Sequence, residues 1–176
     1  MNYEFSNRMK DMKGSAIREI FKAAADPQTI SLAGGNPAPE TFPAVELSKI
    51  ACEILEKEGT LALQYGLTEG YPKLREALRA RLQEKEEIGA ENDELIVVSG
   101  GQQGIDLTVK CLLNEGDGII VEEPSFIGAL NAFRSYGAKL IGVPMQPDGI
   151  DLDALRAALA GGERIKAIYT IPNHQN

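Results

Sequence analysis

The sequence is poor in cysteine and histidine, which build disulfide and metal sites: its 176 residues include two cysteines and one histidine. Cys52 and Cys111 lie far apart, each within a helical pattern, so neither a disulfide framework nor a metal site is expected. We predict that both are reduced thiols in or near the core of a cytoplasmic protein.

Long apolar runs are also absent. Residues 1–13 are charged and polar without the apolar stretch of a signal peptide, and no run approaches the roughly 18 residues of a membrane span. With 26 acidic and 18 basic residues, the net charge is −8, which argues against binding to nucleic acid or an anionic membrane. A small anion is still a possible ligand, because a few backbone amides can hold a phosphate.

The apolar spacing predicts an arm and helices first, and alternating strands and helices afterwards. An arm helix is expected at 15–23, a glycine- and proline-rich segment at 31–39, and helices near 47–55 and from Pro72. Strands are predicted at 95–98, 118–121, 139–143 and 165–171, with helices at 102–113, 126–136 and 151–159. Apolar strands joined by helices need crossovers, so the fold class is α/β: a mainly parallel sheet with helices on both faces.

A glycine pair follows the first predicted strand and opens a helix, in the order Ser99-Gly100-Gly101-Gln102. Two residues without Cβ atoms let backbone N–H groups point at an anion, and the helix N-terminus adds partial positive charge. The pattern matches neither the dinucleotide fingerprint nor a P-loop. A tight strand-to-helix turn without a ligand explains it equally well.

Two further segments follow strand ends. Phe126 comes after Glu122-Glu123-Pro124-Ser125, at the edge where ligands of parallel sheets bind, and could stack on a planar ring or cover the core beneath its own helix. The terminal Asn173-His174-Gln175-Asn176 offers amides that can donate to a ring oxygen without adding charge. We assign no role to the lone histidine.

These elements occur in order with Gly34-Gly35-Asn36-Pro37 and with Tyr65-Gly66-Leu67-Thr68-Glu69-Gly70. Together they resemble the fold-type-I, pyridoxal 5'-phosphate (PLP)-dependent aminotransferases of class I/II, especially the 2-aminoadipate and kynurenine aminotransferase subgroup. The resemblance covers nearly the whole chain from about Ser15. It implies an N-terminal arm and substrate-side segment at 1–44, and the N-terminal portion of a PLP-binding large domain, truncated at its C-terminus, at 45–176.

The resemblance also implies site residues. The family's phosphate cradle, usually Gly-Ser-Gln, falls on Gly100-Gly101-Gln102, so a serine hydroxyl is missing here. Phe126 corresponds to the aromatic that stacks on the pyridine ring, and Asn176 to the asparagine at the ring's phenolic oxygen. Tyr65 corresponds to a tyrosine that reaches the cofactor phosphate of the opposite subunit, which implies a homodimer with shared active sites.

For substrates, the resemblance implies an amino acid and a 2-oxo acid between which an amino group is transferred. Gly34 and Gly35 match the segment over the substrate, and Arg18 matches an arm arginine that can bind a distal carboxylate; a solvated helix-face charge is the alternative for Arg18. No lysine of this chain stands in the context of the Schiff-base lysine, so no catalytic residue is assigned and the chain is expected to be inactive alone.

Two alternatives to an enzyme stay open. The same region resembles the effector domain of MocR-type transcription regulators, in which a DNA-binding segment precedes it; the short arm after Met1 and the acidic charge favour the enzyme. A non-catalytic PLP-binding fragment is the other alternative, which the missing lysine supports.

Overall fold

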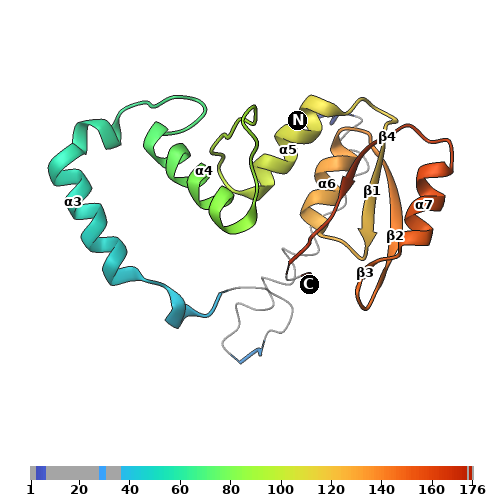
Figure 1. Ribbon diagram of the computed structural model, residues 1–176, viewed down its shortest axis with the longest axis horizontal. Helices are drawn as coiled ribbons and strands as arrows, with labels where there is room; N and C mark the ends of the chain where they lie inside the picture. The colour runs from blue at the N-terminus through green and yellow to red at the C-terminus, as the bar shows by residue number, and fades with distance from the viewer. Residues whose placement is uncertain (1–2, 7–27, 31–36, 174, 176) are drawn as a thin grey trace. The chain divides into compact units, whose positions relative to one another are not determined.

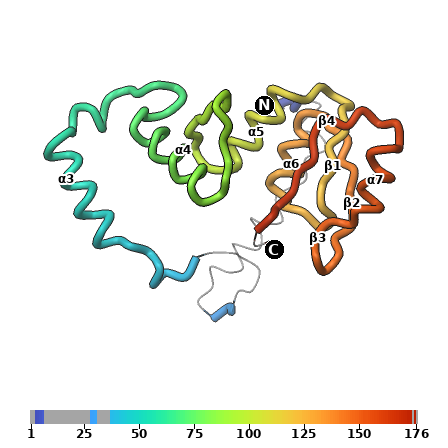
Figure 2. The backbone as a smooth tube through the Cα atoms, viewed as in Figure 1, coloured from blue at the N-terminus to red at the C-terminus, as the bar shows by residue number. Residues whose placement is uncertain are grey.

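A computed structural model describes residues 3–6, 28–30, 37–173 and 175. The chain forms two compact units, one made of residues 35–98 and the other of residues 1–34 with 99–176. The predicted arm helix at 15–23 and most of the glycine- and proline-rich segment, 31–36, lie outside the described residues. Figure 1 gives the element labels, and Figure 2 the backbone path within each unit.

The unit of residues 35–98 is helical. It contains the short 3-10 helix η1 (Pro39–Thr41) and the helices α3 (Ala44–Leu63) and α4 (Pro72–Glu86). Pro72 is the first residue of α4, where its missing N–H costs no helical hydrogen bond, and the helix ends at Glu87 in a left-handed conformation with φ 55°. Both predicted helices are confirmed. None of their described residues is buried, and the apolar side chains of α3 are exposed.

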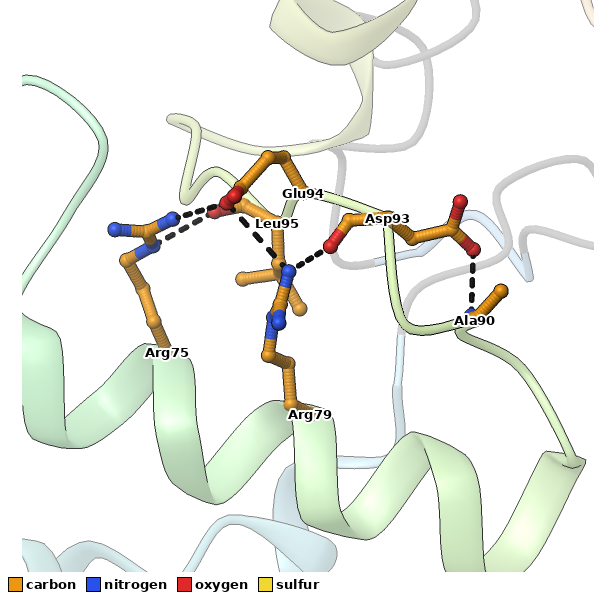
Figure 3. A network of polar contacts seen from close by, with 6 residues as sticks. All are labelled: Arg75, Arg79, Ala90, Asp93, Glu94 and Leu95. Atoms are coloured by element: carbon orange, nitrogen blue, oxygen red, sulfur yellow. Dashed lines mark hydrogen bonds and ion pairs between the residues drawn. The ribbon is translucent and has the colours of Figure 1, made fainter.

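Two arginines of α4 hold the segment that follows it (Figure 3). The Nε of Arg75 donates to the carbonyl of Leu95 at 2.7 Å, and Arg79 donates to the carbonyl of Asp93. The Glu94 carboxylate lies 3.0 Å from Arg75 and 3.5 Å from Arg79. Because Glu94 is largely exposed, these ion pairs add little stability; the bonds to backbone carbonyls determine the path of the chain.

These contacts explain why the strand predicted at 95–98 is wrong. The segment has no strand structure, and Ile96 is 56% exposed. The Leu95 carbonyl is bound by an arginine, and the Val97 N–H donates to the carbonyl of Glu69 at 2.9 Å instead of joining a ladder. An apolar run shows only that a strand is possible; it does not supply a partner strand.

The second unit contains a four-stranded sheet in the order β3-β2-β1-β4. Its strands are β1 (Gly118–Glu123), β2 (Lys139–Gln146), β3 (Gly149–Ile150) and β4 (Ile165–Tyr169), and its helices α5 (Gly101–Leu112), α6 (Ile127–Ser135) and α7 (Leu152–Ala160). β1 pairs in parallel with β2 and β4, whereas the two-residue β3, which the sequence analysis missed, pairs antiparallel to β2. The predicted α/β class with a mainly parallel sheet is confirmed.

The strand order leaves β1 between its two parallel neighbours. The chain crosses from β1 to β2 through α6, and from β2 back past β1 to β4 through α7. These two crossovers move along the sheet in opposite directions, and right-handed crossovers of that kind put their helices on opposite faces of the sheet. Figure 1 shows α6 and α7 on the two sides of the sheet. This arrangement creates a switch point at β1, where ligands bind beyond the carboxyl ends of the strands.

The core lies between β1 and the helix pair α5 and α6. Ile119 and Val121 of β1 pack there with Val109 of α5 and with Phe133 of α6, and the Phe133 ring meets Tyr169 of β4 edge-on at 5.4 Å. Ile120 points to the other face and is also fully buried, as expected of a strand covered on both sides. The two cysteines are free, but both are exposed, so their predicted position in or near the core is wrong.

Candidate functional site

The glycine pair forms the N-terminus of α5. Gly100 is the N-cap, with φ 85° and ψ 165°, a conformation that residues with a Cβ rarely adopt. Its carbonyl accepts from the N–H groups of Gln103 and Gly104 at 3.1 and 3.3 Å. Within the described chain, the N–H groups of Gly101 and Gln102 have no hydrogen-bond partner. Two amides at a positive helix end are therefore available to an anion.

The Gln102 side chain joins this turn to the loop after β1. Its Nε2 donates to the carbonyl of Gly128, in the first turn of α6, at 3.1 Å. Phe126 is the N-cap residue of the same helix. A Cβ at Gly128 would lie 2.5 Å from the Phe126 ring and 2.6 Å from the Gln102 amide oxygen, so both side chains pack against the space that this glycine leaves open. The glycine turn at Gly100-Gly101, which is the candidate phosphate site, and the Phe126 ring therefore lie close together.

Two observations bear on whether this turn and ring could hold a ligand. Phe126 is 43% exposed, so its ring is not part of the buried core. The Ser125 hydroxyl, which precedes it, is a buried oxygen without a hydrogen-bond partner among the described residues. Because buried polar groups are normally paired, an unsatisfied one beside an accessible ring is a feature that a polar ligand could satisfy.

Glu122 connects the carboxyl end of β1 to the chain after β4. Its side chain is buried, with 4% exposed, and its Oε1 accepts from the Ile171 N–H at 2.9 Å. Its other oxygen, Oε2, accepts from the Gln175 side-chain amide. Burial, and secondly the negative charge of Glu122, raise the pKa of Tyr169. Glu122 thereby connects the carboxyl end of β1 to Ile171 and Gln175, in the chain that follows β4.

The described structure brings together four of the predicted site residues: Gly100, Gly101, Gln102 and Phe126. Tyr65 lies in the other unit and is fully exposed. Arg18, Gly34, Gly35 and Asn176 lie outside the described residues.

Sequence reasoning missed Glu122, Ser125 and Gly128. A signal existed for Glu122, because a carboxylate directly follows the apolar strand Ile119-Ile120-Val121. No sequence signal marks Gly128 or the unpaired Ser125 hydroxyl, since both depend on tertiary packing.

The residues present fit a phosphorylated planar ring. Free amides at a helix N-terminus suit a phosphate, a half-exposed phenyl ring suits the face of a heterocycle, and an unpaired hydroxyl can bond a polar substituent. Each donor is neutral, so phosphate charge would be held by amides and the helix dipole.

Comparison with known protein families decides the assignment. The family described as "Aminotransferase class I and II" matches residues 27–171. The chain belongs to this family. The match spans α3, α4 and the sheet of the second unit, and so includes the glycine turn and the Phe126 loop.

Relatives and solved structures similar to this chain include several aminotransferases. "Aromatic-amino-acid aminotransferase 1" of Thermococcus litoralis is 40% identical, with 100% of this chain and 44% of the relative covered. The kynurenine aminotransferase of Pyrococcus horikoshii has a TM-score of 0.90 and 38% identity, with 98% and 43% covered. LysN, the α-aminoadipate aminotransferase of Thermus thermophilus, solved with N-(5'-phosphopyridoxyl)-L-leucine, has a TM-score of 0.83 and 40% identity, with 98% and 41% covered.

The chain spans less than half the length of these relatives. A regulator of the helix-turn-helix type, YdcR of Escherichia coli, is also similar, at 30% identity over 91% of this chain and 34% of the regulator. Among the described residues, no helix combines the length and apolar character that a membrane crossing requires.

Proposed function

We propose that this chain carries the cofactor-binding part of a PLP-dependent aminotransferase that transfers an amino group between an amino acid and a 2-oxo acid. Membership of the aminotransferase class I and II family supports the reaction type. The hydrogen bond between Gln102 and Gly128 supports it most directly, because it joins the anion-binding turn to the loop of the stacking ring at the switch point of the sheet.

Each cofactor-binding residue has a proposed task. The N–H groups of Gly101 and Gln102 hold the phosphate, and Gly100 supplies the backbone conformation that exposes them. Phe126 supports one face of the pyridine ring, and the Asn176 amide donates to the ring's phenolic oxygen. Arg18, Gly34 and Gly35 are proposed substrate contacts, with Arg18 binding a distal carboxylate.

PLP supplies an electron sink for the carbon that loses a proton during transfer. The residues of this chain bind and orient, because none of its lysines stands in the family context of the lysine that moves this proton. We therefore propose that the 176-residue chain binds the cofactor without turning over. Appreciable transamination by this chain with added PLP would contradict that part of the proposal.

A homodimer with shared active sites is part of the proposal. The loop after α3 carries Tyr65, whose side chain is fully exposed and free to reach another subunit's cofactor phosphate. Along α3, Leu47, Ile50 and Ile54 are 58%, 51% and 45% exposed, which leaves an apolar helix face available to a partner. Concentration-dependent sedimentation tests this: a monomer at every concentration would contradict it for this chain.

The test of cofactor binding uses pyridoxamine 5'-phosphate, which carries the same ring and phosphate but cannot form a Schiff base with surface lysines. Titration followed by ligand fluorescence measures the dissociation constant of the chain and of two variants. Phe126→Ala is expected to weaken binding about two- to twelvefold, the range of an aromatic stacking contact. Gln102→Ala is expected to weaken it as well, because it frees the turn from the Gly128 carbonyl.

The chain provides matched controls for both variants. Phe42→Ala and Gln83→Ala remove the same side chains from exposed positions in the unit of residues 35–98 and should leave binding unchanged. Pyridoxamine without its phosphate should bind far more weakly than the phosphorylated form. Equal affinity for the two ligands, or no binding of either, would refute the proposed site.

A ligand-sensing regulatory domain is the second candidate, supported by the similarity to YdcR. It predicts the same cofactor binding and so needs a different test. The acidic charge of −8 gives this chain no general affinity for DNA, and a gel-shift titration of the chain is expected to show none. Sequence-specific DNA binding by the chain would favour the regulator.

A further inference from the structure

The Gln103 side chain reaches back to the turn that begins α5. Gly100 is the N-cap of this helix, so Gln103 is the third helical residue. Its Oε1 atom accepts a hydrogen bond from the Ser99 N–H at 2.6 Å, although the residue is exposed and water is available to it. A glutamine at this position commonly bonds to the N–H of the N-cap residue itself. Here it bonds one residue earlier, so its contact spans the whole turn.

Gln103 restrains Gly100 from both sides. Its side chain holds the Ser99 N–H, immediately before Gly100, and its own backbone N–H donates to the Gly100 carbonyl at 3.1 Å. Gly100 has φ 85° and ψ 165°, and a glycine has the widest choice of other backbone conformations. A turn with two adjacent glycines therefore needs an outside contact to keep one conformation, and Gln103 supplies it.

This conformation determines which N–H groups of the turn are left for a ligand. The Ser99 N–H is occupied by Gln103, whereas the N–H groups of Gly101 and Gln102 have no partner within the described chain. The Gln102 side chain also bonds to the first turn of α6, the helix whose N-cap is Phe126. The unpaired N–H groups are therefore held in place beside the Phe126 ring without a ligand.

We propose that Gln103 is a positioning residue for the cofactor phosphate: its side-chain oxygen holds the Ser99 N–H and thereby keeps the N–H groups of Gly101 and Gln102 directed at the phosphate. This inference rests on the proposed function, which assigns those two N–H groups to the phosphate. Gln103 itself touches no ligand atom. It acts by removing conformational freedom that the turn would otherwise lose when the ligand binds.

Two substitutions separate the hydrogen bond of this side chain from its size. Gln103→Met keeps the length of the side chain and its lack of charge but has no oxygen that can accept from the Ser99 N–H. Gln103→Glu keeps both the length and an acceptor oxygen. The three residue types have similar helix propensities, so α5 itself is little affected. Gln83→Met is the matched control, since it makes the first change at an exposed position of α4, in the other unit.

The first measurement needs no ligand. Exchange of the Ser99 amide hydrogen, followed by NMR, reports directly on the hydrogen bond that Gln103→Met removes. Exchange in this variant is expected to be about two- to twelvefold faster, the net effect of losing one such bond. Gln83→Met should exchange like the parent chain, and Gln103→Glu should be at least as protected. Equal exchange in the parent chain and in Gln103→Met would show that the side chain does not hold the turn, and would overturn the inference.

The second measurement is the affinity for a phosphorylated and an unphosphorylated ligand. Each protein is titrated with pyridoxamine 5'-phosphate and with pyridoxamine, and thermal unfolding verifies that the variants keep their fold. Gln103→Met is expected to bind the first ligand about two- to twelvefold more weakly and to bind pyridoxamine as the parent chain does, because only the phosphate contacts the turn. General damage to the site would weaken both ligands alike. Gln83→Met should bind both ligands unchanged.

The outcomes distinguish this inference from the proposed function. A parent chain that does not bind pyridoxamine 5'-phosphate would contradict both. If the parent chain binds it, and Gln103→Met either binds it equally well or weakens both ligands by the same factor, only the inference about Gln103 is overturned. Tighter binding by Gln103→Met would overturn it as well, because the side chain would then compete with the phosphate for the Ser99 N–H.

Discussion

Replacing Gly101 by serine tests the anion site by adding a group instead of removing one. Gly101 is the first residue of α5, and a Cβ built there would have no heavy atom within 4 Å. Its φ also lies outside the left-handed region, so serine can adopt the same backbone. The new hydroxyl would stand beside two N–H groups that lack partners within the described chain, where it could donate to the same phosphate.

The expected gain in affinity follows from the hydrogen bond that the new serine hydroxyl would donate to the phosphate. A hydrogen bond to a charged group is worth about 1.5–3 kcal/mol, and ordering the serine hydroxyl offsets part of this. We therefore expect Gly101→Ser to bind pyridoxamine 5'-phosphate about tenfold more tightly, a change of about 1.4 kcal/mol. The apo chain should become slightly more stable too, because serine restricts the unfolded chain more than glycine does.

Gly100→Ser is the control, since it adds the same atoms one residue earlier. Gly100 has φ 85° and ψ 165°, and placing serine in that conformation costs about 1–3 kcal/mol. This variant should therefore melt at a lower temperature and bind the ligand less tightly. Fluorescence titration and thermal unfolding measure both variants. A gain at position 101 that also appears with unphosphorylated pyridoxamine, or no gain at all, would refute an anion site at this helix end.

Three further predictions concern single side chains. Burial, and secondly the charge of Glu122, raise the pKa of Tyr169. The stability that the neutral phenol contributes is therefore complete below the ordinary pKa of 10.0 and is lost as the pH rises through the raised value. Tyr169→Phe should make the loss of stability in alkali less steep, as measured by urea unfolding against pH. The Ala154 N–H, more than any other contact, lowers the pKa of Asp151, which caps α7. The stability that the Asp151 carboxylate contributes is present above its ordinary pKa of 3.8 and is lost as the pH falls through the lowered value. Asp151→Asn, which keeps a capping side chain, should therefore make unfolding in acid less steep, and an unchanged profile of stability against pH would contradict this. Gly128→Ala places a Cβ 2.5 Å from the neighbouring phenyl ring and should weaken pyridoxamine 5'-phosphate binding severalfold in titration; unchanged binding would show that the ring position does not matter.

Local patterns predicted most of the second unit. Apolar runs placed β1, β2 and β4, and the acidic Asp151 at the start of α7 acts as its cap, with N–H groups 2.9 and 3.0 Å from its Oδ1. The same kind of run failed at 95–98, where the backbone groups of Leu95 and Val97 bond to Arg75 and to Glu69. Strand formation needs a neighbour, and periodicity in one segment carries no information about that neighbour.

The candidate site likewise contains residues that the sequence predicted and residues that it did not. The glycine pair was predictable because its chemistry is local: a turn, a helix end and free amides. The sequence marked Glu122 only by its position after an apolar strand, and it did not mark Gly128 at all, because their partners lie 49 and 26 residues away in sequence. Which carboxylate is buried, and which glycine leaves room for a ring, depends on how the crossovers return the chain to one edge of the sheet.

The distribution of paired and unpaired groups at that edge argues for a ligand. Gln102 bonds to the first turn of α6 and Glu122 bonds to the chain after β4, so both side chains build this edge of the sheet. The N–H groups of Gly101 and Gln102 and the Ser125 hydroxyl have no partner within the described chain, although they lie in the loops that those bonds hold together. The N–H groups of Gly101 and Gln102 are exposed, but the Ser125 hydroxyl is buried, and a buried polar group without a partner costs about 1–3 kcal/mol. Ordered but unsatisfied donors beside an accessible aromatic ring are what a site for a phosphorylated ring requires before that ligand binds.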